Sequence, residues 1–61
     1  MLRFENGWEV WVMSIDNLWG ASYSHNGKHV MNSNFTSYNR DEVVEHIKNA
    51  FDMIGYKQIG R

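Results

Sequence analysis

The sequence predicts an α+β domain: a three- to four-stranded antiparallel β-meander followed by one amphipathic helix packed on one face. Two observations support this class. Turn signals divide the first half of the chain into short segments rich in β-formers. An apolar stripe at helical spacing follows a capping residue in the second half. At 61 residues, the chain is expected to form a single domain (1–61) and, as a monomer, to be marginally stable.

Two-residue turn signals define the expected strands. They are Asn6-Gly7, Asn26-Gly27 and, more weakly, Asp16-Asn17. Type I′ hairpin turns need positive φ at both central residues, which Asn and Gly tolerate. The expected strands are 2–5, 8–15, 18–25 and 28–35. If each turn holds two residues, three cross-strand pairs follow: Glu5 with Trp8, Ile15 with Leu18, and His25 with Lys28.

This register sorts the side chains onto two apolar faces. The first face collects Leu2, Phe4, Trp11, Met13, Ile15, Leu18, Met31 and Phe35. The second face collects Trp8, Val10, Val12, Trp19, Ala21, Tyr23 and Val30. We expect the helix on the first face, because the small residues Gly20, Ser22 and Ser24 allow close approach there. A slip of one residue would exchange the faces but leave a surplus of apolar sheet surface.

The helix is expected at about 40–54. Asn39 is the predicted N-cap, and Glu42 completes a variant capping box three residues later. The apolar stripe consists of Val43, Val44, Ile47, Ala50, Phe51 and Ile54. Gly55 suits the left-handed position that ends a helix. Residues 56–60 either form a short C-terminal strand or lie across the sheet, and the sequence leaves both open.

Composition argues against several classes of function. Without cysteine, the chain has no thiolate metal site, catalytic thiol or disulfide framework, so we expect a reducing, cytoplasmic setting. No segment has the length and hydropathy of a membrane span or signal peptide. Six basic and seven acidic residues give a net charge of −1 without a basic cluster, which disfavours nucleic-acid binding.

Residues that could carry chemistry are scattered. His25 and His29 flank one turn but point to opposite faces in the expected register, which does not suit a metal site. The carboxylates in the helix segment lie on its polar side or in its cap, and no serine or threonine has the surroundings of a nucleophile. We therefore expect a non-enzymatic protein with no catalytic residue, no metal and no cofactor.

The apolar face left uncovered in this arrangement is the candidate binding site. It comprises Trp8, Val10, Val12, Trp19 and Tyr23, with Arg3 and Lys28 at the rim. One interpretation is core, covered by the 56–61 tail. A second is an interface, with a second copy or with another protein. A third is a stacking platform for single-stranded nucleic acid or a small flat ligand.

The order of elements is similar to that of many unrelated small domains, including antitoxin-type and double-stranded-RNA-binding folds. The matching residues are structural, so no function follows from the likeness. A short chain rich in Asn, free of Cys and Pro and lacking catalytic groups resembles accessory proteins of phages and mobile elements. That resemblance implies a protein-binding module that inhibits a host or defence protein by occlusion, in the host cytoplasm if phage-encoded. A homodimer is one expected form.

Overall fold

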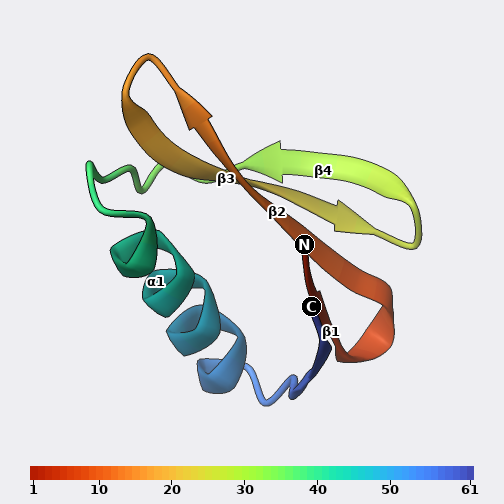
Figure 1. Ribbon diagram of the computed structural model, residues 1–61. Helices are drawn as coiled ribbons and strands as arrows, with labels where there is room; N and C mark the ends of the chain where they lie inside the picture. The colour runs from red at the N-terminus through yellow and green to blue at the C-terminus, as the bar shows by residue number, and fades with distance from the viewer.

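The computed structural model describes residues 1–61 and has one sheet and one α-helix (Figure 1). The elements are β1 (Leu2–Phe4), β2 (Trp8–Ile15), β3 (Leu18–His25), β4 (Lys28–Asn32), α1 (Arg40–Met53) and β5 (Gln58–Gly60). β1 to β4 form an antiparallel meander, β5 pairs antiparallel with β1, and the strand order is β4-β3-β2-β1-β5. The predicted α+β class is confirmed.

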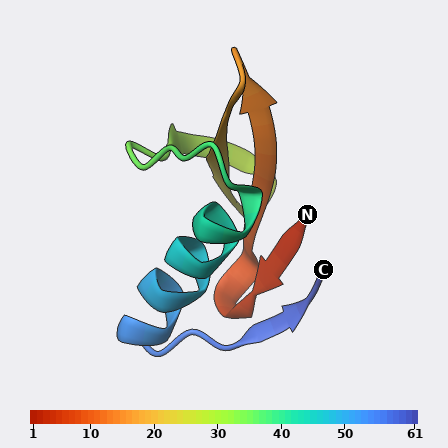
Figure 2. The ribbon, with the colours of Figure 1, turned by 60° about the vertical axis from the view of Figure 1, so that its left-hand side comes forward.

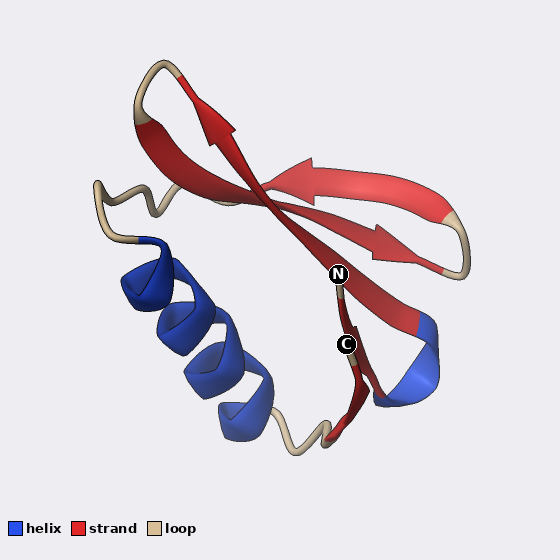
Figure 3. Ribbon diagram, in the orientation of Figure 1, coloured by secondary structure: helices blue, strands red, loops and turns tan.

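The molecule has two layers. α1 and the segment that leads into it lie on one side of the sheet, and no element covers the other side (Figure 2). The sheet is strongly twisted, so that β2 and β3 cross in the view of Figure 3. We call the side facing α1 the inner face and the uncovered side the outer face. α1 has neither the length nor the hydropathy needed to cross a lipid bilayer.

Two of the three predicted pairs are present, and one is wrong. Ile15 lies opposite Leu18, and His25 lies opposite Lys28. Glu5 does not face Trp8, because Glu5–Gly7 form a turn of 3-10 helix and Phe4 takes that place. The turn holds three residues, with positive φ at its last two, where the prediction assumed two. The strand predicted at 2–5 therefore ends at Phe4.

The longer turn moves Leu2 and Phe4 to the other face. Leu2 lies opposite Val10, and Phe4 lies opposite Trp8, so all four share the inner face. A register shift in β4 has the same effect on Met31, which lies opposite Tyr23 instead of Ser22. β4 ends at Asn32, short of the predicted 35.

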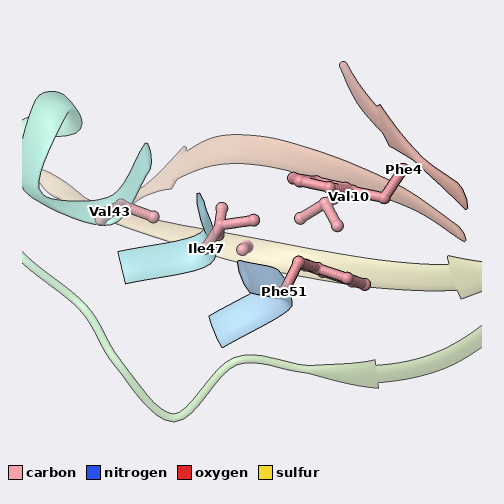
Figure 4. Close-up of a cluster of buried hydrophobic side chains, with 6 residues drawn as sticks. Phe4, Val10, Val43, Ile47 and Phe51 are labelled. Atoms are coloured by element: carbon pink, nitrogen blue, oxygen red, sulfur yellow. The ribbon is translucent and has the colours of Figure 1, made fainter. Parts of the chain in front are cut away.

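The prediction that the helix docks on the face of Trp11 and Met13 is wrong. α1 packs on the opposite face, where Val43, Ile47 and Phe51 meet strand residues in the core. The fully buried cluster consists of Phe4, Val10, Ala21, Val43, Ile47 and Phe51 (Figure 4). Once Leu2 and Phe4 join it, the inner face carries most of the apolar area, and the hydrophobic effect favours covering that face.

Asn39 caps the start of α1 as predicted, but the predicted capping box is replaced by a bridge through Ser37. The side chain of Asn39 accepts a hydrogen bond from the Asp41 backbone N–H at 2.9 Å. Glu42 contributes through Ser37, whose hydroxyl donates to the Glu42 carboxylate at 2.6 Å and accepts from the Asn39 N–H at 3.0 Å. Gly55 has φ +81° and ends the helix in the left-handed conformation. The helix closes at Met53, one residue before the predicted end.

The C-terminal segment forms the strand that the sequence left open. Gln58 lies opposite Phe4 and Gly60 opposite Arg3, with a register shift between the two pairs. The Glu5 backbone N–H donates to the carbonyl of Lys57 at 2.9 Å, and the Glu5 carboxylate accepts from the Lys57 N–H at 2.8 Å. The two ends of the chain therefore lie side by side in the sheet (Figure 1).

Candidate binding surface

The outer face carries a strip of exposed apolar side chains. It consists of Trp11, Met13 and Ile15 from β2 with Leu18 from β3, and we call it the outer strip. Trp11 is 49% exposed, Met13 39% and Ile15 62%. These side chains lie together because alternate residues of a strand point to the same side. The strip is the part of the predicted apolar surplus that the fold leaves uncovered.

Polar side chains border the strip. At one end of the strip, the Arg3 guanidinium Nε lies 3.5 Å from a carboxylate oxygen of Glu9. The β3 residues opposite Glu9 and Trp11 are Ser24 and Ser22. The sheet thus has one apolar face and one mixed face, as expected for a sheet covered on one side. The outer strip is an apolar patch with polar residues at its border.

A hollow of about 310 Å³ adjoins the strip near the β2–β3 turn. Met13, Ile15 and Leu18 line one part of it, and Asn32 and Thr36 line another. Its floor is Gly20, which lies opposite Met13 and has no side chain to fill the space. The hollow has room for one apolar side chain of a partner beside the polar groups of Asp16, Asn32, Ser33 and Thr36.

The predicted site residues lie mostly on the inner face. Val10 is completely buried, and four others are half-buried against the core: Trp8, Val12, Trp19 and Tyr23. The structure brings these five together, as the sequence predicted, but beneath α1. α1 covers most of this cluster, and Tyr56 from the 56–61 tail packs beside it against Phe51.

The two predicted rim cations lie apart from each other. Arg3 is on the outer face with Glu9, and Lys28 is exposed next to the Asn26-Gly27 turn. The cation that lies near a predicted stacking residue is Arg40 of α1, whose guanidinium carbon is 5.9 Å from the centre of the Trp19 ring. Arg40 therefore helps to fasten α1 to the sheet.

A second apolar site lies where the end of α1 meets β3 and β4. It is a groove of about 260 Å³, lined only by apolar residues: Trp8, Tyr23, Met31, Ala50, Phe51 and Ile54. Met31 is 50% exposed and Ile54 60% exposed at its border. The groove arises because the shift in β4 turns Met31 toward the helix side.

The histidines and acidic residues do not converge on one point. No group of three or more His, Asp or Glu side chains lies close enough together to hold a metal ion. A ring nitrogen of His25 is hydrogen-bonded to the Asn6 carbonyl at 2.8 Å, and one of His29 to the Asn32 side chain at 3.0 Å. The ring of His46 stacks on Phe35 at 4.4 Å. Each histidine thus has a local structural contact.

The outer strip lies outside the predicted contact residues. The sequence predicts that its members share one face, which is correct, but the prediction that the helix covers this face is wrong. The length of the first turn could have indicated the correct side. With three residues in that turn, Phe4 and Trp8 lie opposite each other and on the same face as Val10. Arg3 and Glu9 then share the other face, and the resulting contrast between faces predicts the correct docking side.

Comparison of the chain with protein-family models, with curated proteins and with solved structures gives no match.

Proposed function

We propose that this chain is a small, non-enzymatic protein-binding module whose contact surface is the outer strip. The observation that carries the proposal is the half-exposed Trp11, fixed on a rigid strand between Met13, Ile15 and a polar border. Tryptophan is among the residues that most often provide the binding energy of protein interfaces. Polar residues at the rim and an apolar centre are the usual anatomy of such contacts.

The charges around the strip fit a protein partner. The Arg3 guanidinium, which lies on the same face as Trp11, is paired with the Glu9 carboxylate. Trp8, Trp19 and Tyr23, which a stacking platform would need, contact the core. Single-stranded nucleic acid needs several stacking rings and a positive groove. Protein binding is therefore the better-supported use of this face.

The mode of action we propose is occlusion. A partner that packs on Trp11 and inserts a side chain into the hollow above Gly20 would have that part of its surface blocked by the sheet. No chemical step is required. The resemblance of the composition to phage and mobile-element accessory proteins supports an inhibitory role against a host or defence protein.

The test is affinity capture from bacterial extract with the purified, immobilised chain, at high salt and after nuclease treatment. Three proteins are compared: the wild type, Trp11→Ser and a matched control, Met53→Ser, at an 86% exposed helix position. We expect a protein retained by the wild type and the control but not by Trp11→Ser. Equal retention by all three would refute a contact through the strip. Salt-sensitive binding to single strands would favour the nucleic-acid alternative.

A further inference from the structure

β2 has an open edge along its second half. β1 pairs with β2 only from Trp8 to Val10, whereas β3 pairs with β2 as far as Ile15. From Trp11 onward, β2 therefore has a neighbour on one side only. Figure 1 shows β2 continuing beyond the end of β1 toward the β2–β3 turn, where β3 is its paired neighbour.

The free backbone groups on this edge belong to Val12 and Ser14. Ile15 and Leu18 flank the two-residue turn and form a hydrogen-bonded pair, and hydrogen-bonded and non-bonded pairs alternate along an antiparallel ladder. Trp11, Met13 and Ile15 thus bond to β3, while Val12 and Ser14 direct their N–H and C=O groups outward. No turn, loop or cap bond within the chain uses these groups.

The other two edges of the sheet are protected in ways that this one is not. β4 carries Lys28 and a register shift, and β5 is three residues long with a register shift of its own. Charges, irregular pairing and short length are the usual means by which proteins prevent edge-to-edge association. The segment from Val10 to Ile15 has no charge, no proline and no irregularity.

We propose that this edge pairs with the same edge of a second copy of the chain, about a two-fold axis at Met13. In this register, Val12 lies opposite Ser14 of the second copy and Ser14 lies opposite its Val12. The four free groups of each edge then find partners, and the edge is complementary to itself. Met13 faces Met13 on the axis, and no like charges meet.

The dimer leaves the outer strips available. An axis perpendicular to the sheet keeps both copies of α1 on one side and both outer strips on the other. Two strips then form one surface, with Trp11 of each copy beside Ile15 of the other. That this combined surface binds a partner protein rests on the proposed function. Edge pairing buries far less than the roughly 800 Å² per partner of a standard interface, so the dimer is a concentration-dependent equilibrium.

The test of register uses the absence of cysteine from the chain. Met13→Cys places two thiols opposite each other across the axis, within reach of a disulfide. Ile15→Cys is the matched control: it shares strand and face and is more exposed, but its two copies are offset by four residues, about 13 Å. Under oxidation by oxygen with copper phenanthroline, we expect Met13→Cys to cross-link at least tenfold faster. Equal rates, or no cross-linking of Met13→Cys, would overturn the proposal.

The test of edge pairing is the solution mass of the purified chain from micromolar to millimolar concentration. We expect dimer in the wild type and in Ser14→Thr, and monomer in Ser14→Pro, which lacks the outward N–H. A synthetic chain N-methylated at the Ser14 amide removes the same donor if the proline variant does not fold.

A wild type that stays monomeric to millimolar concentration refutes self-pairing. Loss of a captured protein on Ser14→Pro alone would then assign the edge to a strand of that protein. The mass and cross-linking measurements use the isolated chain and need no partner protein. Their outcome is therefore independent of the capture test with Trp11→Ser.

Discussion

The rings of Phe4 and Phe51 stack almost parallel, with 4.1 Å between their centres and 8° between their planes. This contact joins β1 to the last turn of α1, and the ring of Trp8 meets Phe51 edge-on at 5.8 Å. Phe51 therefore connects the helix to the two strands on either side of the Glu5–Gly7 turn.

Replacing Phe51 by alanine is expected to unfold the protein. Large-to-small changes of a buried Phe cost about 3–5 kcal/mol. A chain of this size has a total stability of roughly 3–9 kcal/mol. Circular dichroism with urea titration measures the loss, with Met53→Ala as the control because Met53 is 86% exposed on the same helix. A cooperative transition near that of the wild type for Phe51→Ala would contradict the docking of α1.

The two tryptophans Trp11 and Trp19 are expected to differ in their effect on stability. Trp19→Ala should cost about 2–3 kcal/mol, because the ring is half-buried against the core and lies under Arg40. Trp11→Ala should cost less than about 1 kcal/mol, because half of that side chain already faces water. Urea titration of both variants below the concentration of self-association distinguishes them. The reverse order would mean that the helix covers the outer face.

Gly7→Ala is expected to destabilise the protein by about 2 kcal/mol or more. Gly7 has φ +81°, and a Cβ there would overlap the side-chain oxygen of Asn26 in the facing turn. Gly27 has a similar φ but open space around it, so Gly27→Ala should show strain alone, about 1 kcal/mol. Gly20→Ala should cost nothing. Equal losses at Gly7 and Gly27 would show that the Asn26 side chain moves away from the added methyl group.

Asn39→Ala is expected to lower the free energy of unfolding by about 1 kcal/mol, because the Asp41 N–H loses its acceptor at the start of α1. Asn49→Ala is the matched control: Asn49 is exposed in the middle of the helix, where alanine is the better helix former. Thermal and urea unfolding of both variants provide the comparison. A smaller loss at Asn39 than at Asn49 would rule out the cap.

Local signals predicted the fold well where one or two residues decide the conformation. Asn39 and Gly55 bound the helix as expected, and Asp16-Asn17 and Asn26-Gly27 form the expected two-residue turns, with positive φ at all four positions. In each case, the residue types alone permit the required backbone geometry.

The face on which α1 docks depends on the number of residues in the first turn, which local signals do not determine. Asn6-Gly7 is compatible with a turn of two residues and with the observed three, because both use Gly7 at positive φ. The choice follows from tertiary packing: the longer turn brings Phe4 onto Phe51. The predicted contact residues Trp8, Val12, Trp19 and Tyr23 keep their predicted face, and they lie under α1 because Leu2 and Phe4 join that face.

The pairing of β5 with β1 has a consequence for how the chain acquires its structure. Glu5 and Lys57 are 52 residues apart and share two hydrogen bonds, so this edge closes only after nearly all of the chain is available. Contacts between distant residues raise the entropic barrier to folding, in contrast to the local β2–β3 hairpin. During synthesis the hairpin can form early, while the β1 edge stays unpaired until Gln58–Gly60 leave the ribosome.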